Sequence, residues 1–266
     1  MLSIEEIKLL IEKLEKLKNS KDLNKIIEEN LKVLKDIEMV VDANNSREID
    51  RLDKTLDWFR LDLEHKKKTP NIDQWLYRMV QSKIFQFAKT NLYNSLEIGP
   101  GNGVFSKEFR AWRNNYFIDV LVETERKIRK KFNPAHQKYI KFYTTDKTNC
   151  DKIPAESCNF IFSWDTFVFF TQEHITQYLR DMKRVLIDGG FCFIHYADCH
   201  YDLDLTHAKR GYWNYNTKTA MIKMIKDQGF EVVEMNQFKP GANYAIFRKP
   251  GKQNPVVYKV SEITLD

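Results

Sequence analysis

The spacing of apolar residues predicts helices over about the first 65 residues. Ser3 and Glu6 form a capping box, in which the two side chains satisfy free N–H groups at the start of a helix. Apolar residues then recur every three or four positions, which is the period of one helix face. Each stripe is narrow and needs a partner, so we expect either a packed helical hairpin or a dimer contact. The three stripes are Ile7, Leu10, Leu14 and Leu17; Leu23, Ile27, Leu31 and Leu34; and Ile49, Leu52, Leu56, Phe59 and Leu63.

A polar stretch at 66–71 is followed by one further predicted helix over 72–90 and then by short β-rich runs that alternate with helical stretches. This alternation is typical of a parallel sheet covered by helices. We therefore predict an α/β fold: a Rossmann-like, seven-stranded, mostly parallel sheet with an antiparallel last strand at residues 71–250. A helical region at 1–70 precedes it and a C-terminal tail at 251–266 follows. The predicted strands are Ser95–Ile98, Tyr116–Val122, Ile140–Thr144, Asn159–Ser163, Phe191–Tyr196, Glu231–Phe238 and Asn243–Phe247.

Composition narrows the class of protein. The chain is 42% hydrophobic and 30% charged, as ordinary globular proteins are, and no apolar run reaches the roughly 18 residues that span a bilayer. The N-terminus lacks the basic and apolar segments of a signal peptide, so we expect a cytoplasmic protein without a membrane span. The four cysteines form no CxxC pair, which favours reduced thiols, and we expect no metal site. A net charge of +6 is moderate, and its basic runs are typical of solvated surface.

Residues 95–105 carry the strongest chemical signal, a strand followed by a turn with glycines at 99, 101 and 103 and then a helix start. Glycine permits φ angles closed to other residues and leaves no Cβ in the way of a ligand, and a helix start offers free N–H groups. Glu97 lies just before the turn. Glu123 is placed at the end of the next predicted strand, where a carboxylate can accept both hydroxyls of a ribose. Such an acid also suits NAD, but Val104 stands where the dinucleotide pattern GxGxxG needs its third glycine, so the pattern favours a methyl donor.

Three motifs in this order and spacing resemble those of class I S-adenosylmethionine-dependent methyltransferases. Residues 97–103 (EIGPGNG) resemble motif I, residues 153–163 resemble the approach to the fourth strand, and residues 184–190 (RVLIDGG) resemble the RVLKPGG turn, with Asp188 in place of Pro. The resemblance covers about residues 90–248. It implies S-adenosyl-L-methionine as donor and S-adenosyl-L-homocysteine as product. The donor-binding residues that it implies are Glu97, Gly99, Pro100, Gly101, Gly103, Glu123, Thr124, Asp146, Asn149, Cys150, Ser163 and Trp164.

A finer likeness concerns the acceptor. Residues 162–168 (FSWDTFV) and 193–196 (FIHY) resemble a pattern found in methyltransferases of bacterial surface-carbohydrate gene clusters, including capsule phosphoramidate pathways. Phe169 and Tyr196 stand where that pattern has histidines, so this chain departs from it if those histidines serve the acceptor. The resemblance implies an O-methyltransferase. Its acceptor would be a small carbohydrate, or a phosphoramidate- or phosphate-linked intermediate of capsule or other surface-polysaccharide biosynthesis.

Polar residues after the fourth and fifth strands are the candidates for catalysis, because the carboxyl ends of parallel strands line the crevice of such folds. Alignment supplies most of the rate of methyl transfer, and an alcohol acceptor also needs a base. The candidates are His195 as base, Asp165 as an orienting or charge-balancing group, and Tyr196. A buried, hydrogen-bonded core role stays open for His195, and a helix-capping role for Asp165. The loop 200–207 is rich in metal-capable groups, but nothing else in the chain supports a metal.

The residues after that loop combine cations with aromatic rings, which suits a sugar-phosphate or nucleotide acceptor and also suits a packed loop. They are Lys209, Arg210, Tyr212, Trp213 and Tyr215. Two further function classes stay open. RNA methylation is disfavoured because Ser-Trp-Asp-Thr at 163–166 differs from the Asn/Asp-Pro-Pro-Tyr type used on base amines, and no RNA-binding module is recognisable. The other is a donor-binding, non-catalytic scaffold that acts through its N-terminal helices, and a homodimer through those helices fits each class.

Overall fold

The computed structural model describes residues 7–9, 11–12, 30–32, 34–35, 72–87, 94–109, 114–145 and 149–251. The described N-terminal residues are helical, and Ile7, Ile11 and Leu31 are buried together with Leu34 packed against them. Members of the first two predicted stripes therefore contact each other. The third predicted stripe and the linker lie outside the described residues, and so does all of the predicted tail except Gly251.

Within the described part of the chain, seven strands form one sheet in the order β3-β2-β1-β4-β5-β7-β6. Strands β1 to β5 run parallel to one another, whereas β7 is antiparallel to both β5 and β6. The predicted Rossmann-like sheet with an antiparallel last strand is confirmed. The strands are β1 (Asn94–Ile98), β2 (Asn114–Asp119), β3 (Ile140–Thr144), β4 (Cys158–Ser163), β5 (Leu186–Tyr196), β6 (Glu231–Gln237) and β7 (Asn243–Arg248).

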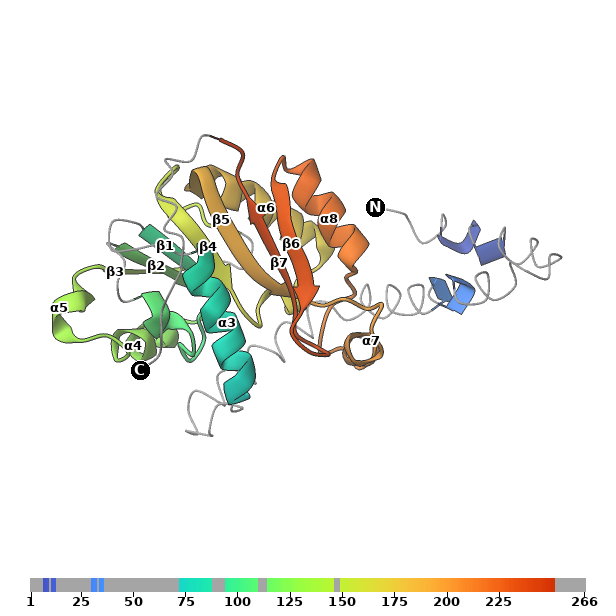
Figure 1. The fold of residues 1–266 in the computed structure, drawn as a ribbon, viewed down its shortest axis with the longest axis horizontal. Helices are drawn as coiled ribbons and strands as arrows, with labels where there is room; N and C mark the ends of the chain where they lie inside the picture. Colours follow the sequence, from blue (N-terminus) through green and yellow to red (C-terminus); the bar gives the residue numbers. More distant parts are fainter. Residues whose placement is uncertain are drawn as a thin grey trace, which may run out of the picture.

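Different helices cover the two faces of the sheet, because successive side chains of a strand point to opposite faces. Phe160 and Phe162 of β4 pack in a cluster with buried residues of α3 (Gln74–Phe87), whereas Ile161 between them packs with α6 (Gln172–Val185) and α8 (Lys218–Asp227). Figure 1 shows α3 on one face and α6 and α8 on the other. Covered faces explain the nearly continuous apolar runs of the central strands. No helix among the described residues is both long and apolar enough to span a bilayer.

Short helices make up the connections of this layered core. They are η1 (Ser106–Phe109), α4 (Glu123–Arg129), α5 (Pro134–Gln137), η2 (Phe167–Phe169) and α7 (Asp202–Lys209). Two helix starts agree with sequence signals: the Thr171 hydroxyl accepts the His174 N–H group ahead of α6, and the Thr217 hydroxyl accepts the Ala220 N–H group ahead of α8.

Three expectations about local structure are wrong. Strand β2 ends at Asp119 and not at Val122, so Glu123 is the first residue of α4 and ends no strand. The turn at 101–105 leads into the short 3₁₀ helix η1, so the residues described there do not start an α-helix. The predicted loop at 200–207 contains most of α7, whose first turn carries two acidic residues that match the helix dipole.

Candidate active site

The glycine turn after β1 contains three left-handed residues, with φ of +66° at Gly99, +50° at Gly101 and +68° at Gly103. A Cβ at Gly99 would lie 2.2 Å from Thr166 Oγ1, and one at Gly103 would lie 2.8 Å from Ile128 Cδ1. At Gly101 a Cβ would have no neighbour within 4 Å. Of the three glycines, Gly101 alone therefore has open space where its Cβ would lie, whereas Gly99 and Gly103 make room for side chains of the protein itself. Pro100 is buried, and its carbonyl accepts the Gly103 N–H group (2.8 Å).

An acid does stand at the end of β2, but it is Asp119. Its carboxylate is buried and accepts the N–H groups of Leu121 (3.0 Å) and Gly101 (3.2 Å). Burial raises the pKa of Asp119 above its usual value, and these two hydrogen bonds oppose that rise. Glu123, the sequence-based candidate, is exposed on α4, and Thr124 beside it is buried. The structure therefore places Asp119, and not Glu123, against the open glycine.

Glu97 lies one residue before the end of β1 with its carboxyl group buried. It accepts a hydrogen bond from the Ser106 hydroxyl (2.6 Å). Burial raises the pKa of Glu97 to about 8, against the lowering effect of the Ser106 hydrogen bond. A buried acid with a perturbed pKa, on the strand that carries the glycine turn, marks this place as a candidate site.

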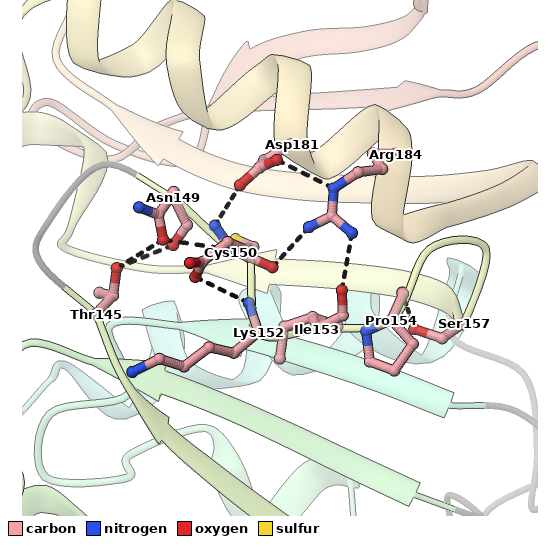
Figure 2. A network of polar contacts seen from close by, with 10 residues as sticks. Thr145, Asn149, Cys150, Lys152, Ile153, Pro154, Ser157, Asp181 and Arg184 are labelled. Atoms are coloured by element: carbon pink, nitrogen blue, oxygen red, sulfur yellow. Dashed lines mark hydrogen bonds and ion pairs between the residues drawn. The ribbon is translucent and has the colours of Figure 1, made fainter.

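The loop after β3 borders Asp119 directly. The Thr145 N–H group donates to the Asp119 carbonyl (3.0 Å), and the Thr145 hydroxyl donates to the Asn149 carbonyl (3.0 Å). Figure 2 shows Asn149 and Cys150 beneath α6. The Cys150 thiol is fully buried in the core cluster on the α6 face, and its pKa is raised well above the usual value by burial. Asp146, the remaining candidate of this loop, lies outside the described residues.

The loop after β4 closes over the glycine turn. The Ser163 hydroxyl, fully buried, donates to the Ile98 carbonyl (2.8 Å), and Thr166 Oγ1 lies 3.2 Å from the Gly99 carbonyl oxygen. Asp165 between them has a left-handed backbone (φ +56°), a conformation that Asp tolerates and that concentrates at functional sites. The glycine turn after β1 and the loop after β4 are therefore one connected structure.

Asp165 and His195 meet at the carboxyl ends of β4 and β5. His195 Nδ1 lies 2.8 Å from Asp165 Oδ1 and accepts, at 3.2 Å, from the Asp165 N–H group when it is unprotonated. His195 Nε2 lies 3.1 Å from the Gly241 carbonyl, which can only accept, so Nε2 carries a proton. The ring is buried and stacks on Trp164 with 4.6 Å between centroids, while 65% of the Asp165 side chain is exposed. Of the two, Asp165 is the group that an acceptor can reach.

Tyr196 is not brought to this pair. It is buried in the core cluster on the α6 and α8 face, opposite to the face that holds Trp164, and burial raises its pKa. Within the described part of the chain, no group of three or more His, Cys, Asp or Glu side chains could hold a metal ion. The buried acids Asp198 and Asp204 instead serve backbone and amide partners: Asp204 accepts from the Asp198 N–H group (2.7 Å) and from the Asn243 amide.

The strand order, the glycine turn after β1 and the buried acid at the end of β2 define a Rossmann-like methyltransferase. Residues 43–235, more than half of the chain, match the family described as a methyltransferase domain. The chain belongs to this methyltransferase family. Family and fold together imply S-adenosylmethionine as the methyl donor and S-adenosylhomocysteine as the product. No curated protein matches the sequence.

The chain is similar in fold to many solved structures, among which are the following three. An S-adenosylmethionine-dependent methyltransferase from Mesorhizobium loti has a TM-score of 0.53 at 11% identity, over 64% of this chain and 96% of that chain. The N-methyltransferase NodS from Bradyrhizobium japonicum has 0.52 at 16%, over 67% and 99%. The [4+2]-cyclase SpnF has 0.54 at 12%, over 69% and 85%. Because one of these neighbours is named for a different reaction, the likeness shows the fold alone and leaves the acceptor to be argued from the site.

Proposed function

We propose that the donor lies over Gly101, with its ribose held by Asp119, and that the enzyme methylates a hydroxyl group of a small carbohydrate. The donor placement fits two observations: the space beyond Gly101 is open, and a carboxylate stands against that glycine. The donor supplies an electrophilic methyl group on a sulfonium. The protein's own groups orient the acceptor and receive its proton.

The observation that carries the choice of a hydroxyl is the exposed Asp165 carboxylate beside His195 Nδ1. A carboxylate can accept the proton of an acceptor hydroxyl, and His195 Nδ1, 2.8 Å away, can then take that proton from Asp165. Nδ1 changes in this step from accepting the Asp165 N–H group to donating to the carboxylate. Stacking on Trp164 and the bond from Nε2 to Gly241 keep the ring in place for both states.

The sequence leaves two types of acceptor atom open, a phosphate-type oxygen and a sugar hydroxyl, and the negative charge of Asp165 distinguishes them. A phosphoramidate or phosphate oxygen is already an anion, needs no base, and would meet like charge at Asp165. A sugar hydroxyl is neutral and donates to the same carboxylate. We therefore favour a sugar hydroxyl as the acceptor atom, within the surface-carbohydrate chemistry that residues 162–168 and 193–196 resemble. A phosphate elsewhere on the acceptor could still reach the exposed Lys209 and Arg210 at the C-terminal end of α7.

The test is Asp165→Asn in the full chain, with Asp227→Asn as the matched control because Asp227 is a similarly exposed carboxylate on α8, paired with Lys223. Transfer of a labelled methyl group to panels of sugars, sugar phosphates and phosphoramidates identifies the acceptor. Asp165→Asn should then lower kcat by about 100-fold or more and leave the Kd for S-adenosylhomocysteine unchanged. A kcat within about threefold of wild type, or a product with its methyl group on a phosphate-type oxygen, would refute the role of Asp165.

A further inference from the structure

The turn between β6 and β7 supplies a hydrogen-bond acceptor for the ring of His195. The Gly241 carbonyl oxygen lies 3.1 Å from His195 Nε2, and Gly241 has a left-handed backbone (φ +77°). The Lys239 carbonyl accepts the Ala242 N–H group (2.9 Å) and closes the turn. In a neutral histidine, the partner of one ring nitrogen decides which of the two nitrogens holds the proton. The direction of one backbone carbonyl therefore decides whether His195 Nδ1 is free to accept.

Three side chains from another part of the chain hold this turn. A Cβ at Gly241 would lie 3.0 Å from Leu203 Cδ2 and 3.6 Å from Trp213 Cη2, so both side chains pack against this glycine. The amide of Asn243, which begins β7, donates to Asp204 Oδ2. Leu203 and Asp204 belong to α7, which Figure 1 shows beside the end of the β6–β7 hairpin. We call Leu203, Asp204 and Trp213 the turn clamp.

Stability alone does not account for the buried Asp204. Burial raises the pKa of this carboxyl group above its usual value. Oδ2 accepts both the Asp198 N–H group (2.7 Å) and the Asn243 amide, whereas Oδ1 has no hydrogen-bond partner among the described residues. A buried carboxylate oxygen without a partner destabilises the folded state. What Asp204 does hold is the residue that begins β7, next to the turn that contacts His195.

Packing holds the His195 ring but does not select its tautomer. The ring stacks on Trp164 with 4.6 Å between centroids, and Trp213 meets it edge to face at 6.0 Å. The ring can keep this place with its proton on either nitrogen. Two acceptors compete for that proton, the Gly241 carbonyl at Nε2 and the Asp165 carboxylate at Nδ1. A carboxylate is the stronger acceptor, so the Nε2 form depends on a well-placed carbonyl.

We propose that the turn clamp positions the Gly241 carbonyl and so keeps neutral His195 protonated on Nε2, which leaves Nδ1 free to take a proton from Asp165. Asp204 and Asn243 are then positioning residues, which act on the proton transfer without touching the acceptor. This inference rests on the proton path proposed above. When the bond between these two residues is lost, the turn can move and the carbonyl leaves Nε2. Part of the His195 population then carries its proton on Nδ1, where it cannot take another.

The test is nuclear magnetic resonance of the full chain with isotope-labelled histidine, because a ring nitrogen gives a different signal with and without its proton. The signals that disappear in His195→Gln are those of His195. With its ring neutral, wild-type His195 should carry the proton on Nε2. Asn243→Leu should move part of this proton to Nδ1, and Leu203→Ala should shift it in the same direction. Leu203 is 42% exposed, so this second variant carries the test if a change at the buried Asn243 disturbs the fold.

Two changes at Asp204 separate the hydrogen bond from a general disturbance. Asp204→Ala should resemble Asn243→Leu, whereas Asp204→Asn should keep the wild-type tautomer, since an amide oxygen can still accept the Asn243 amide. Val233→Ala is the control and should change nothing, because Val233 is an apolar residue of β6 that is exposed to a similar extent as Leu203. With the acceptor identified above, the variants that change the tautomer should lower kcat by about tenfold. The Kd for S-adenosylhomocysteine should stay within about twofold of wild type.

Three results would overturn these statements. If wild-type His195 carries its proton on Nδ1, or if the clamp variants keep the wild-type tautomer, the turn clamp has no positioning role. If Asp204→Asn changes the tautomer as Asp204→Ala does, the charge of Asp204 acts and its bond to Asn243 does not. If the clamp variants change the tautomer while Asp165→Asn keeps the wild-type kcat, the turn clamp positions His195 but the proton path of the proposed function fails.

Discussion

The substitution Asp119→Asn tests the donor site most directly, because it changes one buried carboxylate to an amide of nearly the same shape. Asp119 has two carboxylate oxygens for the two ribose hydroxyls, and a hydrogen bond to a charged group is worth about 1.5–3 kcal/mol. An amide offers a single oxygen. It loses one of these two bonds, which lowers the binding free energy by about 1.5–3 kcal/mol. At 1.4 kcal/mol for each factor of ten, affinity for S-adenosylhomocysteine should fall by about 10- to 100-fold.

The matched control is Glu123→Gln, the same chemical change four residues later. Glu123 is exposed on α4, outside the strand, so its substitution should leave the affinity within about twofold of wild type. Titration calorimetry of both variants at one pH and salt concentration gives the comparison. Thermal unfolding checks that Asp119→Asn keeps its fold, since an amide oxygen can still accept one of the N–H groups of Leu121 and Gly101. A Glu123→Gln protein with weakened binding beside an unaffected Asp119→Asn protein would refute the reasoning.

Three further predictions concern the glycine turn and the strand before it. Gly101→Ala should unfold within a few degrees of wild type, because its Cβ would meet no protein atom and would add only the left-handed strain of about 1–2 kcal/mol. It should nevertheless lose detectable binding of S-adenosylhomocysteine, because the Cβ would fill the space in which we place the donor. Gly99→Ala should instead lower the unfolding temperature clearly, because its Cβ would lie 2.2 Å from Thr166 Oγ1; equal melting curves for the two variants would contradict this. The raised pKa of Glu97, about 8, means that the native state holds a proton that the unfolded state releases near pH 4.5, so this contribution to stability is lost as pH rises from about 5 to 8. Urea titrations should show this decline in the free energy of unfolding, and Glu97→Gln should flatten it; an unchanged slope would exclude Glu97 as its source.

The sheet could be predicted from the sequence because each central strand has apolar residues on both sides. Alternate residues of β4 and β5 fill two separate cores, so each strand appears as a short apolar run between turn residues. The end of β2 was missed for a local reason. Val120, Leu121 and Val122 continue the apolar run, but Asp119 Oδ1 accepts the Leu121 N–H group and turns the chain out of the strand. Asp is a poor strand residue, and that was the available signal.

The pairing of Asp165 with His195 could not be predicted from the sequence, for a different reason. His195 and Asp165 are 30 positions apart, and their identity as a pair depends on two strands being neighbours with the register of Phe162 beside Phe193 and Ser163 beside Ile194. Parallel neighbours could be predicted, but register could not, so Tyr196 stayed among the candidates beside His195. Successive residues of a strand point to opposite faces of the sheet, so a change of one residue in register exchanges them. His195 therefore lies at the site, whereas the next residue, Tyr196, lies in the core.

The glycine motif predicts the backbone turn but not which of its glycines has open space beside it. All three glycines have positive φ, and this shared requirement is what a GxGxG pattern detects. Whether the space beside a glycine serves a ligand depends on what lies opposite its missing Cβ, and the residues that decide this come from elsewhere in the chain: Thr166 at Gly99 and Ile128 at Gly103. A motif therefore identifies the turn but not the contact. The same substitution made two residues apart should damage folding at one glycine and donor binding at the other.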